Sequence, residues 1–443
     1  MIPPDSRALR CAVIGAGIAG MACADRLSRE AEVVVFESSD QPGGHTDTHE
    51  VTVDGTRVAI DSGFIVFNHL NYPGFAGWLD RLGVRSHASD MSFSVTDRSA
   101  GIEYGTHKLA ALFCQPGNLL RPGHWRMLRD ILRFHDLATA VKASESAMGV
   151  GAWCRSRRLS DEFLHRHLLP MCAALWSQSL SASEGIAVGQ VVAFMRNHRM
   201  LQVYDRPEWR VVSGGSRKYV QAFVSSFNGT LACGSTVRAV RERAGRVELL
   251  VDARWLAFDA VVLACHSDQA LDLIEAPTPA ETSILGNVRY ASNRVVVHTD
   301  PVVMPRSRLA WSSWNATTGI DPGLPCSVTY WMNLLQGVRT PRPVFVTLNP
   351  DATIDSSRVL VERSYTHPQF DAAALAAQRR LAELDGQAHR YFAGAWQGFG
   401  FHEDGFMSGV RAAEQLLARE TGFQSMGTSS QLSPQVARIG TGT

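Results

Sequence analysis

The chain lacks the features that would place it among metal-binding, disulfide-bonded, nucleic-acid-binding or membrane-spanning proteins. Its eight cysteines are scattered, with no Cys-x-x-Cys or His-x-x-His spacing, so neither a zinc site nor a disulfide framework is indicated. A net charge of +1 gives no argument for a nucleic acid partner. No apolar run reaches the roughly 18 residues that span a bilayer, and the first strand begins too early for a signal peptide. We therefore expect a cytoplasmic protein in a reducing compartment.

A glycine-rich turn near the N-terminus carries the first positive signal. An apolar strand ends at Ile14 and is followed by Gly15-Ala16-Gly17-Ile18-Ala19-Gly20. Gly15 allows a tight turn, Gly17 lets backbone amides approach a pyrophosphate, and Gly20 lets the following helix pack closely on the sheet. The N–H groups at the start of that helix, around Ile18 and Ala19, favour phosphate oxygens. The pattern predicts a dinucleotide site.

A carboxylate follows at the spacing that such a site needs. A second apolar strand, residues 33–36, ends in Glu37, which lies 17 residues after Gly20. A carboxylate there can accept hydrogen bonds from an adenosine ribose. The glycine pair Gly43-Gly44 follows within a few residues and brings further N–H groups to the cofactor. This favours FAD over NAD.

The segment Gly43-Gly44-His45-Thr46 resembles the corresponding motif of the flavin amine oxidase superfamily, which includes monoamine oxidases, protoporphyrinogen oxidases and phytoene desaturases. Those proteins usually have Gly-Gly-Arg-x-x-Thr here, so His45 replaces the arginine that normally lies near flavin and substrate. His45 either takes a different role at that place or is a polar turn residue. The resemblance implies an α/β fold: a Rossmann-like FAD-binding domain of the amine oxidase and glutathione reductase type, with an inserted α+β substrate domain.

The 443 residues are enough for two domains. The segment order of the superfamily predicts a discontinuous FAD-binding domain made of 1–75, 206–275 and 386–420. The residues predicted to contact the cofactor are Gly15, Gly17, Ile18, Ala19, Glu37, Gly43, Gly44, His45, Thr46, Gly63, Val237, Gly394, Gly405 and Phe406. In the family the residue that matches Val237 holds the adenine through its backbone. The helix after the Gly394 loop is expected to direct its positive end toward the flavin pyrimidine.

The remaining segments, 76–205 and 276–385, are assigned to the substrate domain, and 421–443 to a mobile tail. Four aromatic residues, Trp311, Trp314, Tyr330 and Trp331, crowd one stretch of the second segment. They either build core or line a lipid-sized apolar pocket.

Lysine is scarce, and this bears on the reaction. Only Lys108, Lys142 and Lys218 occur, none of them within 276–385. Many amine oxidases place a lysine from that region near the flavin to assist reoxidation by oxygen. The absence argues against a dedicated amine oxidase.

A narrower resemblance suggests a substrate. Segments such as Trp311-Ser312-Ser313-Trp314-Asn315 and 394–409 look like a subgroup encoded beside cyclopropane-fatty-acid-synthase-like methyltransferases. One branch is implicated in furan fatty acid formation. The resemblance implies that the enzyme desaturates a methyl-branched acyl chain of a phospholipid by hydride transfer to flavin N5, with a methyltransferase as a partner.

Other functions remain open at this point. The chain is alternatively a fatty acid double-bond isomerase, or an oxidase or desaturase of amines, porphyrinogens or carotenoids. It is otherwise a flavin-carrying partner of the methyltransferase with little activity of its own.

A phospholipid substrate requires contact with a bilayer. Between 121 and 135, Trp125, Leu128, Ile131 and Leu132 follow helical spacing and arginines occupy another face. Such a helix either lies in an anionic membrane surface, here the inner face, or packs on its own domain.

Desaturation also releases a proton, and a neutral imidazole can accept it. His45 is the first candidate for this role and His298 the second, although an alternating strand surrounds His298 and makes a structural role the simpler reading. His402 is expected to be a neighbour of the flavin, and Glu403 a carboxylate at a helix start.

Overall fold

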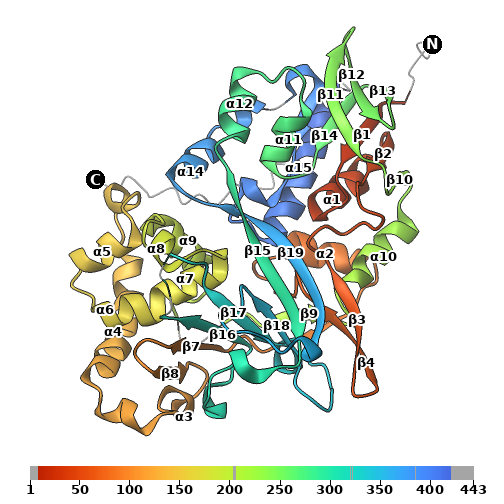
Figure 1. The fold of residues 1–443 in the computed structure, drawn as a ribbon. Coiled ribbons are helices and arrows are strands. Elements are labelled where there is room, and N and C mark those ends of the chain that lie inside the picture. The colour runs from red at the N-terminus through yellow and green to blue at the C-terminus, as the bar shows by residue number, and fades with distance from the viewer. Residues whose placement is uncertain (1–7, 203–205, 320, 322, 385, 421–443) are drawn as a thin grey trace.

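The computed structural model describes residues 8–202, 206–319, 321, 323–384 and 386–420; the predicted tail, 421–443, lies outside them. A parallel five-stranded sheet lies at one end of the molecule (Figure 1). Its strands run in the order β10 (Thr230–Ala232), β2 (Glu32–Phe36), β1 (Arg10–Ile14), β14 (Ala260–Leu263) and β20 (Arg390–Phe392). These strands come from all three segments assigned to the FAD-binding domain, so the sheet joins parts of the chain that are far apart in sequence.

Helices cover one face of this sheet. The helices α1 (Ile18–Leu27) and α15 (His402–Glu420) pack tightly together at Gly409. If Gly409 were replaced by a residue with a Cβ, that atom would lie only 2.0 Å from the carbonyl oxygen of Ala19. With α2 (Pro73–Arg81) and α10 (Arg217–Ser226) they form one apolar core against the sheet. Helix α15 is described as far as Glu420, the last residue of the segments assigned to the FAD-binding domain.

A second apolar core lies on the other face of the sheet. It joins the antiparallel strands β11 (Val237–Arg243), β12 (Arg246–Val251) and β13 (Arg254–Phe258) to α11 (Ser267–Leu273) and α12 (Pro279–Leu285). The apolar run from Phe258 to Ala264 predicts one continuous strand, and this prediction is wrong. Asp259 separates β13 from β14, and its carboxylate and N–H bond Arg10 at the start of β1.

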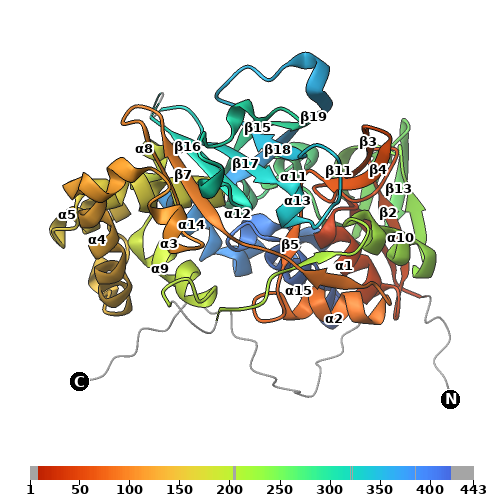
Figure 2. The same ribbon diagram turned by 90° about the horizontal axis from the view of Figure 1, so that it is seen from below.

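The two segments assigned to the substrate domain share a seven-stranded sheet. Its order is β19 (Val359–Gln369), β15 (Arg289–His298), β18 (Phe345–Leu348), β17 (Ser327–Trp331), β16 (Trp314–Thr318), β7 (Phe93–Asp97) and β8 (Ile102–Gly105). All pairs are antiparallel except β16 with β7. Figures 1 and 2 show the long strands β15 and β19 running from the FAD-binding part toward the rest of this sheet.

A group of helices lies at the far end of the molecule from α10 (Figure 2). It contains α3 (Leu109–Leu112), α4 (Pro122–Thr139), α5 (Val150–Ser156), α6 (Asp161–Phe163), α7 (Leu169–Trp176), α8 (Leu180–Glu184) and α9 (Val188–Asn197). A π-helical segment, Leu164–Leu168, joins α6 to α7. The aromatic core of this group includes Phe134, Trp153 and Phe194.

Smaller elements complete the fold. The dipeptide Asp54-Gly55 predicts a hairpin turn, and β3 (Thr48–Val53) and β4 (Thr56–Asp61) join there, with positive φ at both turn residues. A three-stranded sheet joins β5 (Val66–Phe67), β9 (Arg210–Val212) and β6 (Ser86–Ala88). The remaining helices are α13 (Met332–Leu335) and α14 (Ala372–Gln378). Across the described part of the chain, no helix combines the length and apolar character needed to cross a bilayer.

The crowded aromatic residues build core. Trp311 and Tyr330 are 8% exposed, and each packs edge-on against a tryptophan, Trp331 and Trp314 respectively. The two pairs belong to different apolar clusters. The four residues therefore form two separate packing pairs instead of one group.

A buried ion pair fixes the last strand of the parallel sheet. The guanidinium of Arg390 on β20 donates to both oxygens of Glu281 on α12 at 2.8 and 2.9 Å, and their side chains are 4% and 0% exposed. Arg390→Met should lower the free energy of unfolding by about 3–5 kcal/mol, because it leaves a buried carboxylate without its charge partner. Urea unfolding followed by circular dichroism measures this loss.

The matched control is Arg294→Met. Arg294 makes the same two-bond pair with Glu362, but both side chains are about half exposed. Its loss should cost less than about 1 kcal/mol. Equal destabilisation by the two variants would contradict the argument.

Candidate active site

The glycine turn lies between β1 and α1. Its backbone geometry explains why two of its three glycines cannot carry a side chain. Gly15 has φ +99°, and a Cβ there would lie 2.7 Å from the carbonyl oxygen of Ala264 at the end of β14. A Cβ on Gly20 would lie 1.9 Å from the carbonyl oxygen of Gly15. The backbone therefore requires glycine at both positions.

Gly17 has no such internal requirement. Its φ and ψ are −73° and −178°, which any residue adopts, and a Cβ there would meet nothing within 4 Å. Gly17 is the N-cap of α1, and no side chain caps the helix and no acidic residue lies in its first turn. The space and the N–H groups of Ile18 and Ala19 suit a phosphate group. The cradle therefore fits a dinucleotide.

Glu37 lies directly beside this turn. Its side chain is 9% exposed, and its carboxylate accepts hydrogen bonds from the N–H groups of Ala16 and Ser39 at 2.8 and 2.9 Å. A carboxylate has about four acceptor positions, so capacity remains for ribose hydroxyls. The loop before β11 closes this end, because the N–H of Ser235 donates to the carbonyl oxygen of Glu37 at 2.9 Å. Val237 follows as the first residue of β11 and is 6% exposed.

The second glycine pair contacts the first turn. Gly43 donates its N–H to the carbonyl oxygen of Ala16 at 2.9 Å, and a Cβ on Gly44 would lie 3.2 Å from the Cα of Gly17. Gly63 is equally restricted, since a Cβ there would lie 2.0 Å from the carbonyl oxygen of His45. Thr46 exchanges a hydrogen bond with the hydroxyl of Tyr219 on α10. These contacts place 43–46 and 63 next to the glycine turn.

The C-terminal glycine loop reaches the same region. Gly394 donates its N–H to the hydroxyl of Ser408 at 2.8 Å. A Cβ on Gly405 would lie 2.8 Å from Cγ2 of Ile18, so the start of α15 lies against the start of α1. The side chain of Phe406 points into the core, with its ring 5.4 Å from that of Trp78. Only its backbone therefore remains available to a cofactor.

The two acidic residues at the start of α15 serve other elements. The carboxylate of Glu403 accepts from the N–H groups of Gly74 and Phe75, so it caps α2. The carboxylate of Asp404 accepts from Phe399 and Phe401 in the preceding loop. Burial raises the pKa of Glu403 to about 7 and that of Asp404 to about 6.

His45 lies in a group of rings that we call the histidine cluster: His45, His266, His367 and Tyr365. The ring of His45 is 6.0 Å from that of His266 and 5.4 Å from those of His367 and Tyr365. Its Nε2 lies 3.2 Å from the carbonyl oxygen of Thr366, which fixes the ring. His45 lies in the loop after Gly44, His266 lies shortly after the end of β14, and His367 lies on β19.

Burial keeps these imidazoles neutral. It lowers the pKa of His45 despite the bond to Thr366, and lowers the pKa of His266 to about 4. It lowers the pKa of His367 to about 3, and the neighbouring imidazoles act in the same direction. Each ring therefore has an unprotonated nitrogen at pH 7 that can accept a proton, although burial makes His266 and His367 weaker bases than a free imidazole.

His402 and His298 differ from the cluster. His402 stacks on Phe64 with ring centroids 3.6 Å apart and bonds the hydroxyl of Tyr219, so it adjoins the predicted cofactor site. His298 is fully buried at the far end of β15, where its ring bonds Thr347 and the N–H of Asp300. Strand β15 contributes Ser292 opposite Thr366, six residues before His298, which is about 20 Å along a strand. This position and these bonds favour a structural role for His298 over the predicted role as an acid or base.

All three lysines, Lys108, Lys142 and Lys218, are exposed. None lies in the seven-stranded sheet. The chain thus offers no lysine to the interior around the histidine cluster.

A cavity lies near the histidine cluster, on the side of Tyr290. A cavity of about 430 Å³ lies between α8 and the adjoining parts of β15 and β19, and Ile186, Tyr290 and Phe370 line it with polar neighbours. Tyr290 stacks on His266 with centroids 4.3 Å apart. Only one aromatic pair therefore separates this cavity from His45.

Sequence reasoning identified His45 but missed His266, His367 and Tyr365 as its neighbours. His266 carried a usable signal, because it follows β14, and the carboxyl ends of parallel strands face the ligand in such sheets. His367 and Tyr365 lie on β19 with no such signal.

Comparison with known proteins agrees with this geometry. The profile of the family described as flavin containing amine oxidoreductase matches residues 18–333. The fold is similar to that of cyclohexylamine oxidase from Brevibacterium oxydans IH-35A, with 16% identity, a TM-score of 0.68, and coverage of 94% of this chain and 100% of the other. A putrescine oxidase structure with bound putrescine has 15% identity, a TM-score of 0.64, and coverage of 93% and 100%.

A further similar structure is a fatty acid isomerase from P. acnes that produces CLA. It has 14% identity and a TM-score of 0.63, with coverage of 94% of this chain and 99% of the other. The family match covers more than half of the chain, and the site has the glycine turns, free helix N-terminus and carboxylate that FAD needs. The chain therefore belongs to the flavin containing amine oxidoreductase family and is an FAD-dependent oxidoreductase with the fold of that family.

Proposed function

We propose that this oxidoreductase desaturates an acyl chain, namely a methyl-branched fatty acid carried by a phospholipid, in the formation of furan fatty acids. The observation that carries the proposal is the histidine cluster, which burial keeps neutral in a region without lysine. A neutral proton acceptor suits a substrate whose C–H bonds are broken. The resemblance of several segments to the methyltransferase-associated subgroup supplies the acyl class and implies a methyltransferase as a partner.

The residues of the chain divide the work as follows. Bound FAD supplies a two-electron acceptor for the hydride of an acyl carbon. The neutral imidazole of His45 takes the proton that leaves the neighbouring carbon, and the bond to the carbonyl oxygen of Thr366 orients its ring. We place the acyl chain in the cavity beside Tyr290 and Phe370, where Ile186 and Phe370 offer apolar contacts and the polar part of the lining, which includes Arg289, is left for the head of the substrate.

A fatty acid double-bond isomerase is the second candidate. The similarity of the fold to the fatty acid isomerase from P. acnes favours it. In this version the hydride and proton return to the substrate, so the product has the mass of the substrate. A desaturase product is lighter by two hydrogens.

Anaerobic spectra of the purified yellow protein test the proposal. Addition of a methyl-branched, unsaturated acyl phospholipid should bleach the oxidised flavin absorbance, and mass spectrometry should find a product lighter by two hydrogens. The saturated, unbranched phospholipid serves as the matched control and should bleach nothing. Bleaching by a primary amine instead would contradict the proposal, and a product of unchanged mass would favour the isomerase.

A further inference from the structure

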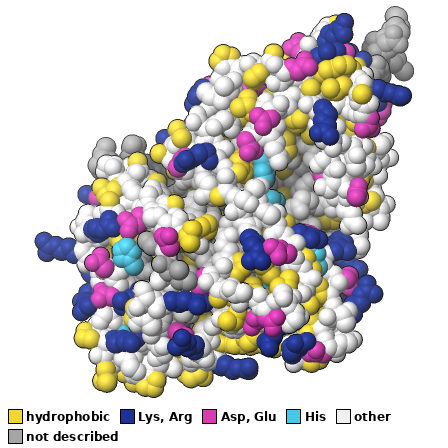
Figure 3. Space-filling model, viewed as in Figure 1, with side chains coloured by type: hydrophobic (Ala, Val, Ile, Leu, Met, Phe, Trp, Pro, Cys, Tyr) yellow, Lys and Arg dark blue, Asp and Glu magenta, His cyan; other side chains and the backbone are white. Residues whose placement is uncertain are grey.

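An apolar corner protrudes from the helical end of the molecule. The 3₁₀ turn Pro116–Leu120 and the first turns of α4 expose Leu119, Leu120 and Trp125 to 52%, 87% and 50%. Leu109 on α3 and Leu132 on α4 are exposed to 72% and 61%. Figure 3 shows hydrophobic side chains together with Lys and Arg along the lower left edge of the molecule, where α3 and α4 lie in Figure 1. We call Leu119, Leu120 and Trp125 the apolar corner.

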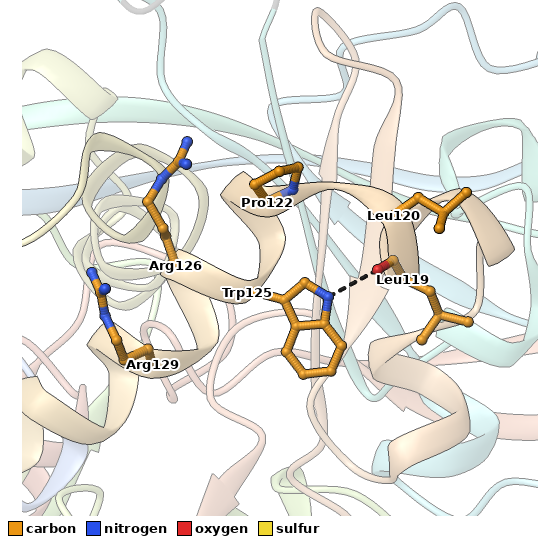
Figure 4. A pocket seen from close by; sticks show the side chains of 6 residues that line it. All are labelled: Leu119, Leu120, Pro122, Trp125, Arg126 and Arg129. Atoms are coloured by element: carbon orange, nitrogen blue, oxygen red, sulfur yellow. Dashed lines mark hydrogen bonds between the residues drawn. The ribbon is translucent and has the colours of Figure 1, made fainter.

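The apolar corner is held in place. The indole Nε1 of Trp125 donates to the carbonyl oxygen of Leu119 at 2.9 Å, as Figure 4 shows. The ring of Phe113 lies 5.2 Å from the indole. Trp125 thus keeps one polar atom bonded while its ring stays at the surface, so exposure of the corner is a fixed feature of the fold.

The exposed face differs from the face that the sequence predicted. Trp125 and Leu132 are exposed as predicted, but Leu128 and Ile131 are partly buried against the cores beneath α4. Met127 and Phe134 are buried as well. The sequence predicted one exposed apolar face along 121–135. In the structure the exposed apolar side chains gather at the start of α4 and in the turn before it.

The charge around the apolar corner is positive. Arg121 lies between the turn and α4, and no carboxylate is within ion-pair distance of it among the described residues. Arg126 pairs with Glu162, and Arg129 shares Asp130 with Arg133. Arg126 and Arg129 line the same shallow depression as Leu119, Leu120 and Trp125 (Figure 4). Cationic groups beside projecting leucines and an indole match the interface of an anionic bilayer, where apolar groups enter the acyl boundary and basic groups meet headgroups.

We propose that the apolar corner docks on the surface of an anionic lipid bilayer. This docking site is independent of the proposed reaction, because it uses none of the residues around the histidine cluster. The described part of the chain contains no helix that could span a bilayer. Docking through the apolar corner would bring the enzyme to a lipid surface without one.

Vesicle flotation of the holoenzyme tests the docking. We expect binding to vesicles of phosphatidylcholine with phosphatidylglycerol, much weaker binding to phosphatidylcholine alone, and weakening by salt. The double variant Leu119→Ser with Leu120→Ser should bind at least about tenfold more weakly, because two aliphatic side chains no longer enter the interface. Arg121→Gln should weaken binding to the anionic vesicles by about fivefold.

Leu324→Ser is the matched control. Leu324 is 57% exposed, much like Leu119, but lies in the loop before β17. It should bind like the unaltered protein. The proposal fails if the holoenzyme ignores anionic vesicles, or if the double variant binds them normally. A third outcome also contradicts it: the unaltered protein binds no vesicles and is a dimer by light scattering, whereas the double variant is a monomer. The apolar corner would then contact a second copy of the chain. The vesicles can be made of saturated lipids, which are not substrates of the proposed reaction. The flotation result therefore does not depend on whether the desaturase proposal is correct.

Discussion

Gly17→Val should yield a folded protein that is colourless. The variant is expected to bind FAD about 10²–10⁴-fold more weakly, because the side chain fills the space at the N-terminus of α1 and blocks two or more hydrogen bonds to a charged pyrophosphate. The fold itself should tolerate valine, since φ at this position is −73° and a Cβ meets no protein atom within 4 Å.

The measurements are the flavin-to-protein absorbance ratio after purification and the thermal melting of the apoprotein. Gly77→Val is the matched control, because Gly77 on α2 is also half-buried and its Cβ would meet nothing within 4 Å. It should keep its flavin, and it exchanges a glycine for a somewhat better helix former. A yellow Gly17→Val protein with full flavin content would contradict the assignment of this turn to the cofactor.

Elements that depend on neighbours in sequence could be predicted from the sequence. The turn at Asp54-Gly55 needs two residues that tolerate positive φ, and both have it. The sequence predicts a helix over 371–384 with Asp371 as its N-cap, and Asp371 does cap α14 by accepting from the N–H of Ala374. The helix ends at Gln378 instead of Leu384, and a 3₁₀ turn over Leu381–Leu384 follows it. Local chemistry thus determines the starts of elements better than their ends.

Contacts between distant segments could not be predicted in this way. Glu403 has the position of a carboxylate that caps its own helix, but it caps α2, whose N–H groups lie 328 and 329 residues earlier in the chain. The outward face of α4 depends on which neighbours cover it, and periodicity alone does not identify them. His45 meets His266 and His367 only because β14 and β19 end beside the loop that follows Gly44.

His45→Ala should slow substrate-driven bleaching of the flavin by about 100-fold while the flavin content stays unchanged, because removal of a general base typically costs about that much. His45 is the histidine of the cluster that lies between the two glycine segments, since Gly44 packs on Gly17 and the carbonyl oxygen of His45 contacts Gly63. Its ring is half-buried and fixed by Thr366, so the alanine leaves the backbone of the cofactor site in place.

The pH profile separates a proton acceptor from a residue that only shapes the site. Burial lowers the pKa of His45 from 6.5, so the imidazole is neutral at pH 7 and above and becomes protonated only in acid. The rate for the unaltered enzyme should be constant above pH 7 and fall below pH 6.5. The slow rate for His45→Ala should lack this acid limb, whereas a variant with a merely distorted site would retain it at a lower level.

His298→Asn completes the comparison, because His298 is the other histidine that the sequence offered for this role. Its ring bonds Thr347 and Asp300 in the core, so the variant should unfold at a lower temperature and still bleach at the normal rate. If His298→Asn instead slows bleaching as much as His45→Ala does, proton transfer does not occur at the histidine cluster. A normal rate for His45→Ala would exclude His45 as the acceptor and leave His266 and His367 as the imidazoles to test.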